Sequence, residues 1–164
     1  MKTNAATVKM AIRPNSKSWQ PNRRRAGYEA WKAMVSTGGP WDQKVNIKQS
    51  GLIDKENPNI LFGEYSTNYQ AVANMHFGYV GNAAGFWLLT LDIGAGFAQK
   101  QDNEKEHIGP GWGDDPFDKW WIHFGYALYD EFGENADSLL EEEFDQFLAD
   151  YIKENGEPPE PLGQ

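Results

Sequence analysis

Residues 114–133, DDPFDKWWIHFGYALYDEFG, constrain the fold more strongly than any other stretch of this chain. They contain the signals of a complete helix: an aspartate that can cap the first turn (Asp115), a proline at the first helical position, and a closing glycine (Gly133). Asp118 follows at the third helical position, where the helix dipole favours a negative charge. The sequence therefore predicts a helix here, with Asp115 and Asp118 as its capping residues.

Three other segments have the apolar spacing of helices. Ser66 or Thr67 can cap a helix that runs to about Tyr79. Residues 83–100 are apolar enough for a buried helix, and residues 135–156 have apolar side chains on one face and acidic ones on the other. The predicted fold is mainly α: a compact single domain of about four helices, with a small β-hairpin or an irregular N-terminal part. An α+β fold is the alternative.

The N-terminal residues 1–27 are basic and contain two prolines but few aliphatic side chains. Such a composition favours an irregular leader over a packed element. A short strand is predicted around Lys44–Lys48, within a hairpin among residues 41–63. We expect residues 28–156 to form the domain and residues 157–164 to form a tail.

The chain has 164 residues, no cysteine and a formal net charge of −9. The absence of cysteine excludes disulfides and thiolate metal sites. The acidity is concentrated in residues 130–164, which have a net charge of −11, whereas residues 1–129 have a net charge of +2. The acidic total therefore does not exclude a polyanionic substrate.

The N-terminal residues lack the continuous apolar core of a signal peptide. The most apolar stretch, residues 83–98, is shorter than a membrane span and contains Thr90 and Asp92. We therefore expect a soluble protein without stable membrane insertion, whose export would not depend on a cleaved signal peptide.

The segment NMHFGYVGNAAG, residues 74–85, places His76 among glycines, alanines and aromatic residues. One interpretation is a core histidine bonded to the backbone, and the other is a general acid or base whose pKa is adjusted by burial. Spacing alone favours the core histidine, because helical periodicity is mainly a core signal. Asn74 is a further catalytic candidate, but it lies two positions away and in a regular helix points to a different side.

The segment that contains His76 has little side-chain bulk on its surface, because Gly78, Gly81 and Gly85 have no side chains. These small residues either let two backbones approach closely or leave room for a polymer beside the histidine. The segment is not a phosphate-binding fingerprint, because no lysine follows the glycines and no strand is evident before them.

Two further carboxylates are candidates for chemistry. Asp114 has no capping role and can act in catalysis or orient a histidine. Glu64 is either a solvated turn acid or an acid whose pKa is raised by neighbouring aromatic residues. The acidic cluster does not match a calcium loop and the histidines do not have zinc-site spacing, so we predict no metal and no cofactor.

The stretch WDQK, which ends at Lys44, combines an aromatic ring, an acid and a cation. Lys44 can neutralise a phosphate or a developing oxyanion. Trp41 and Asp42 are candidates to contact the same substrate, as are Tyr79 and Gln99.

The stretches NMHFGYVGNAAGF, GAGFAQ and GDDPFDKWWIHFGYALY resemble the bacterial polymorphic toxin type 44 family in their order and spacing. WDQK is similar to an upstream element of that family, so the resemblance covers roughly residues 40–130. Some members have an acid where this chain has Gln70, and Glu64 would replace that acid if it is catalytic. The motif residues that carry over are Trp41, Asp42, Lys44, Asn74, His76, Gly78, Gly81, Gln99, Asp114, Asp115 and Asp118.

The resemblance implies a toxin deployed between competing bacteria, carried by a secretion system and matched by a cognate immunity protein. It also implies a nuclease, specifically an RNase, and it shifts the interpretation of His76 toward a functional residue. The leading hypothesis is a metal-independent RNase that uses His76, a carboxylate from Asp114 or Glu64, and Lys44. The alternatives are a peptidoglycan hydrolase with two carboxylates and a non-enzymatic binding module.

Overall fold

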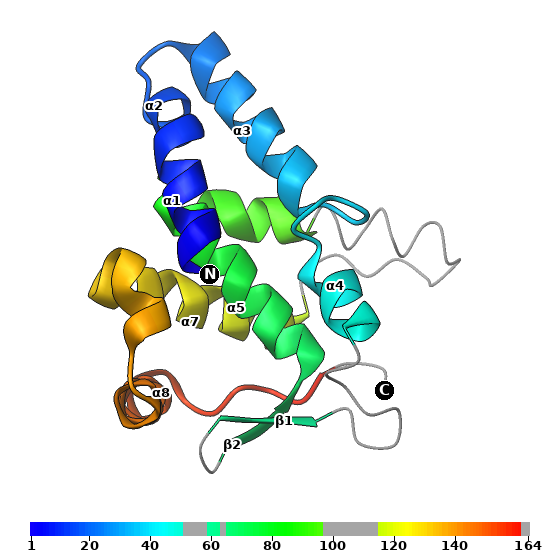
Figure 1. Ribbon diagram of the computed structural model, residues 1–164, viewed down its shortest axis with the longest axis vertical. Helices are drawn as coiled ribbons and strands as arrows, with labels where there is room; N and C mark the ends of the chain where they lie inside the picture. The colour runs from blue at the N-terminus through cyan, green and yellow to red at the C-terminus, as the bar shows by residue number, and fades with distance from the viewer. Residues whose placement is uncertain (51–58, 63–64, 97–114, 162–164) are drawn as a thin grey trace.

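The computed structural model describes residues 1–50, 59–62, 65–96 and 115–161 of the chain (Figure 1). It confirms a mainly α fold with a small antiparallel hairpin. The elements are α1 (Lys2–Ala11), α2 (Arg13–Ser16), α3 (Pro21–Val35), α4 (Gln43–Gln49), β1 (Asn59–Phe62), β2 (Tyr65–Asn68), α5 (Tyr69–Ala83), α7 (Pro116–Phe132), the 3-10 helix η1 (Gly133–Ser138) and α8 (Glu141–Asn155). Residues 88–96 are also helical.

The backbones of α5 and α7 almost touch where the two helices cross (Figure 1). A Cβ atom at Gly78 would lie 1.9 Å from the carbonyl oxygen of Ile122, and one at Gly125 would lie 1.9 Å from the carbonyl oxygen of Met75. Only glycine fits at either position, because no heavy atom can approach a carbonyl oxygen so closely. The interpretation that small residues let two backbones approach is therefore confirmed at Gly78.

Helix α5 lies at the centre of the fold and is buried on nearly every side. It begins at Tyr69 and is capped by Asn68, whose side-chain oxygen accepts from the backbone N–H groups of Gln70 and Ala71. The prediction that Ser66 or Thr67 caps this helix was wrong, because both residues belong to β2. The helix also continues four residues beyond the predicted end at Tyr79.

The β-hairpin lies later in the chain than predicted. Strands β1 and β2 pair antiparallel with Asn59 opposite Asn68 and Phe62 opposite Tyr65, so the hairpin extends past the predicted range 41–63. The strand predicted around Lys44–Lys48 was wrong, since these residues form α4.

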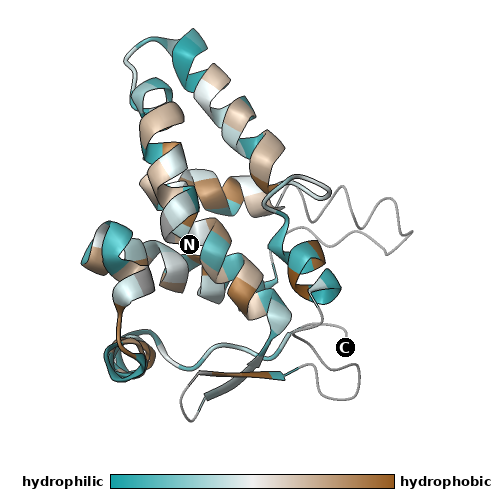
Figure 2. Ribbon diagram, viewed as in Figure 1, coloured by the Kyte–Doolittle hydropathy of each residue, from teal (hydrophilic) through white to brown (hydrophobic). Residues whose placement is uncertain are grey.

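The prediction of an irregular leader over residues 1–27 was also wrong. Helices α1 and α2 and the start of α3 occupy this range, and Ala5, Val8 and Ile12 are buried in the core. Positions 5, 8 and 12 follow helical spacing, so one apolar face of this basic segment packs against the domain. Lys9 and Lys17 are exposed, and the start of α3, which includes Arg23–Arg25, is hydrophilic and exposed (Figure 2).

The helix predicted at residues 114–133 is confirmed as α7. Asp115 accepts a hydrogen bond from the backbone N–H of Phe117 at 3.0 Å, and Gly133 ends the helix with a φ of +56°. The segment predicted as one helix over 135–156 is divided between η1 and α8, which begins with three consecutive glutamates. Aromatic side chains of α8 pack edge-on against Phe124 of α7.

No helix among the described residues combines the length and the apolar character that crossing a membrane requires.

The α5–α7 crossing gives a test of the fold. Gly78→Ala and Gly125→Ala should each lower the free energy of unfolding by about 1–3 kcal/mol, because the added methyl group forces the two helices apart. Gly94→Ala is the matched control, since its Cβ would meet only the end of the Tyr28 side chain at 3.2 Å. Chemical denaturation measures all three, and equal stability of Gly78→Ala and Gly94→Ala would contradict the close crossing.

Candidate functional site

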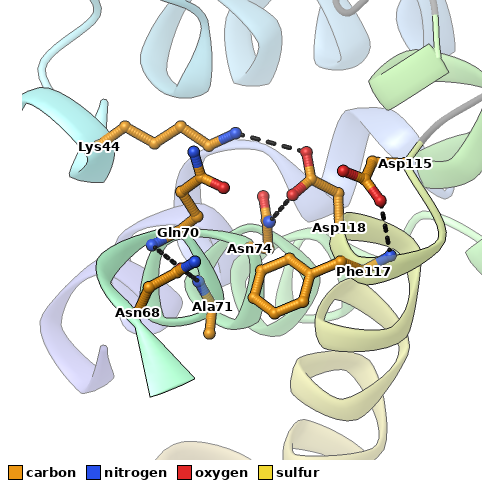
Figure 3. Close-up of polar contacts among 8 residues, drawn as sticks. All are labelled: Lys44, Asn68, Gln70, Ala71, Asn74, Asp115, Phe117 and Asp118. Atoms are coloured by element: carbon orange, nitrogen blue, oxygen red, sulfur yellow. Dashed lines mark hydrogen bonds and ion pairs between the residues drawn. The ribbon is translucent and has the colours of Figure 1, made fainter. Parts of the chain in front are cut away.

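Three polar side chains from three helices meet beside the α5–α7 crossing (Figure 3). The amide of Asn74, on α5, donates to Asp118 Oδ1 at 2.6 Å. The ammonium of Lys44, on α4, approaches Asp118 Oδ2 at 3.5 Å. Asp118 is 8% exposed, whereas the Lys44 side chain is 43% exposed. The buried carboxylate of Asp118 is therefore in contact with a lysine that reaches the surface of the protein.

Asp118 is not the capping residue that the sequence predicted. Its two oxygens face Asn74 and Lys44, which lie 44 and 74 residues away in the chain. Capping of α7 is done by Asp115, as predicted. Asp118 stays close to the positive end of the helix dipole, but its hydrogen-bonding capacity serves contacts between helices.

His76 points to a different side of α5 from Asn74, as the helical spacing predicted. His76 is 5% exposed, and its Nε2 atom lies 3.0 Å from the amide nitrogen of Asn4 on α1. The Trp41 ring meets the imidazole edge-on, with centroids 6.4 Å apart. The segment that starts at Trp41 and continues into α4 thus reaches both His76 and, through Lys44, Asp118.

Helix α4 brings a second lysine to this side of the molecule. Lys48 follows Lys44 by one helical turn, and its ammonium lies 4.8 Å from the centre of the Tyr69 ring. Burial raises the pKa of Tyr69. Hydrogen bonds from Lys48 and Gln70, together with the charges of Lys48 and Lys44, lower this pKa by more than burial raises it, so the net shift is downward. The phenol therefore lies in a cationic environment.

The sequence did not identify Tyr69, Lys48, Gln70 or Asn4 as site residues. The four-residue spacing of Lys44 and Lys48 is the signal that could have identified Lys48. This spacing places both lysines on one face only in a helix, whereas a strand was predicted there. Figure 3 shows the Gln70 side chain beside that of Lys44, at the first turn of α5. No local pattern points to Asn4, because its contact with His76 is long-range.

Asp42 is a structural residue in this arrangement. Its carboxylate accepts hydrogen bonds from the backbone N–H groups of Val45 at 3.2 Å and Gly38 at 2.9 Å. Both oxygens are therefore engaged in capping α4 and closing the preceding turn, and Asp42 is itself buried. It fixes the helix that presents Lys44, although the sequence suggested substrate contact.

The structure corrects two other predictions about residues near His76. Tyr79 was predicted to contact substrate, but it is fully buried and its hydroxyl donates to the carbonyl oxygen of Gly133. The glycines do not leave room for a polymer: Gly78 faces α7, and a Cβ at Gly81 would lie 2.6 Å from Leu91. Gly85 has a φ of +83°, which a glycine adopts without strain.

Glu64, Gln99 and Asp114 lie outside the described residues. Their predicted roles remain predictions. Among the parts of the chain that the structure describes, no three histidine or acidic side chains converge to hold a metal ion.

His123 belongs to a separate polar cluster. Its Nε2 atom lies 2.8 Å from Asp92 Oδ1, and Lys119, one turn earlier on α7, approaches the other oxygen of Asp92 at 3.7 Å. This cluster joins the helical residues 88–96 to α7.

A family model described as bacterial toxin 44 matches residues 30–131 of the chain. The chain belongs to this family. The matched segment includes α4, α5 and α7, and with them Lys44, Asn74, His76 and Asp118. The family therefore supports a role as a bacterial toxin. Curated proteins and solved structures gave no match.

The Asn74–Asp118 contact can be tested by replacing the amide. Asn74→Leu should lower the free energy of unfolding by about 1–3 kcal/mol, because a buried carboxylate loses its donor. Replacing both residues by leucine should cost less than the sum of the two single changes, since neither polar group is then left alone. Asn46→Leu, an exposed amide bonded to Pro40, is the control and should change stability by less than about 0.5 kcal/mol. Additive effects in urea unfolding would contradict the coupling.

The cationic environment of Tyr69 gives a second test. The absorbance difference between the wild type and Tyr69→Phe should titrate below the ordinary tyrosine pKa of about 10. Lys48→Gln should move this titration upward, because it removes both a hydrogen bond and a positive charge. Lys32→Gln, on α3, should leave it unchanged. A Tyr69 titration at or above the ordinary value in the wild type would contradict the arrangement.

Proposed function

We propose that this toxin is a metal-independent ribonuclease whose active site lies where α4 approaches α5 and α7. The observation that carries the proposal is the partly exposed Lys44 side chain beside the buried Asn74–Asp118 pair. The proposal extends to delivery into a competing bacterium and to a cognate immunity protein that blocks the site.

Lys44 is suited to bind a phosphate group. Its contact with Asp118, at 3.5 Å, is long for a hydrogen bond and uses at most one of three N–H donors. Asp118 fixes the direction of the side chain without neutralising its donors, so an incoming phosphate oxygen can take them. Lys48 and Tyr69 extend the same surface and supply a second cation and an aromatic ring for a neighbouring nucleotide.

RNA cleavage without a metal requires three groups. A base takes the proton from the 2′-hydroxyl, whose oxygen then attacks the phosphorus. A cation stabilises the extra negative charge on the phosphoryl oxygens, and an acid protonates the departing 5′-oxygen. We assign the cation to Lys44 and one of the two proton transfers to His76, whose ring is in contact with the segment that leads to Lys44. The other proton transfer falls to Asp114 or Glu64, the carboxylates predicted from the sequence. Asp118, held by Asn74, orients Lys44.

A peptidoglycan hydrolase fits the described residues less well. Its mechanism needs two carboxyl groups that are free to act on a neutral sugar. Asp42 and Asp115 are engaged in capping, which leaves Asp118 as the one carboxylate among the described site residues that does not cap a helix. Paired lysines also favour an anionic substrate over a neutral one.

Expression of the full chain in bacteria separates these functions. We expect growth arrest with degraded RNA when the protein is retained in the cytoplasm. His76→Ala should reduce RNA cleavage by the purified protein by about 10²–10⁴-fold, and Lys44→Gln by about 10²–10³-fold. Lys153→Gln, on α8, is the matched control and should cleave normally.

Two outcomes would overturn the proposal. Toxicity that depends on an added export signal, with intact RNA, would favour the peptidoglycan hydrolase. Full RNA cleavage by His76→Ala would remove the histidine from the mechanism.

A further inference from the structure

The proposed site receives a residue from outside the family-matched segment. That segment begins at residue 30, so α1, α2 and the first half of α3 precede it. Yet Asn4, on α1, lies 3.0 Å from Nε2 of His76, the histidine to which we assign proton transfer. The matched segment by itself therefore lacks one neighbour of its own histidine.

Helix α1 is fixed firmly enough to hold Asn4 in position. Ala5 and Val8, which follow Asn4 along the helix, are completely buried and anchor α1 against the core. At the far end, the Arg13 guanidinium donates to the carbonyl oxygen of Ala83 at 3.2 Å, and the Ser16 hydroxyl donates to that of Ala84. Both carbonyl groups lie at the C-terminal end of α5, so α1 and α2 are tied along the length of the helix that carries His76.

An asparagine amide can serve either form of the imidazole ring. With its nitrogen toward Nε2, it donates to an unprotonated Nε2, and the neutral ring then carries its proton on Nδ1. After a half-turn of the amide, the oxygen can accept from a protonated Nε2, which leaves Nδ1 with a lone pair that can take a proton. Aspartate offers only the second arrangement, and leucine offers neither.

We propose that Asn4 is a positioning residue that sets the protonated nitrogen of His76 and holds the plane of its ring. The proposal rests on the function assigned to His76. If the proposal is correct, α1 contributes a residue to the toxin site. A protein reduced to the family-matched segment should then have an altered tautomer and ring orientation at His76.

The test reads the ring directly. The chain has three histidines, so nitrogen NMR of histidine-labelled protein gives few signals, and His76→Gln identifies those of His76. In the wild type, we expect the neutral ring to carry its proton on Nδ1. Asn4→Leu should weaken this preference and reduce RNA cleavage by about 10- to 100-fold, the range found for groups that orient metal-binding histidines.

Asn4→Asp adds a negative charge beside His76, and the aspartate side chain has almost the same shape as asparagine. The carboxylate accepts from Nε2–H and favours the imidazolium, so the pKa of His76 should rise by about 1–3 units. The limb of the pH–rate profile that depends on His76 should move to higher pH by the same amount. Asn15→Asp, on α2, makes the same chemical change away from the histidine and should leave the ring signals and the profile unchanged.

Unchanged His76 signals in both Asn4 variants would overturn the inference, even if the variants unfold at a lower temperature, because Asn4 would then be purely structural. Equal shifts in Asn15→Asp would overturn it as well. The NMR readout needs no substrate, so it remains decisive if the chain cleaves no RNA. Full cleavage by His76→Ala together with altered ring signals in the Asn4 variants would overturn the proposed function and not the positioning contact.

Discussion

The close crossing of α5 and α7 is the constraint on which the rest of the structure depends. Gly78 and Gly125 each face a carbonyl oxygen of the other helix, so the two backbones approach too closely for a Cβ atom at either position. This approach brings Asn74 within hydrogen-bond distance of Asp118, although the two residues are 44 positions apart. A wider crossing would separate them and leave a buried carboxylate without its amide partner, which is costly.

Around this crossing, capping residues direct the functional side chains. Asn68 starts α5 immediately after β2, Asp42 starts α4, and Asp115 starts α7. Each cap fixes where a helix begins and therefore which side chains its first turns present. Lys44, Tyr69 and Asp118 all lie in such first turns, so the polar surface is built from the N-terminal ends of three helices.

Local signals in the sequence were sufficient for α7, where Asp115 and Gly133 mark the ends of the helix, and for the mainly α fold. Local signals failed where contacts between distant residues determine the secondary structure or the role of a side chain. Val45 and Ile47 alternate as in a strand, but the Asp42 cap starts a helix. The basic composition of the N-terminal residues favoured an irregular leader, although Ala5 and Val8 form an apolar face on α1. Asp118 satisfies the rule for a capping acid and yet serves Asn74 and Lys44, a role that no nearby residue reveals.

The charges of this molecule are separated in space as well as in sequence. Arg23–Arg25 lie at the start of α3 and the glutamates of α8 lie on the opposite side of the molecule (Figure 1). These two clusters give the described part of the protein an uneven charge distribution, in addition to the net negative charge of the chain. A polyanion that approaches at low ionic strength exerts a torque that turns the acidic helix away, and at physiological salt this alignment acts only within about 8 Å of the surface.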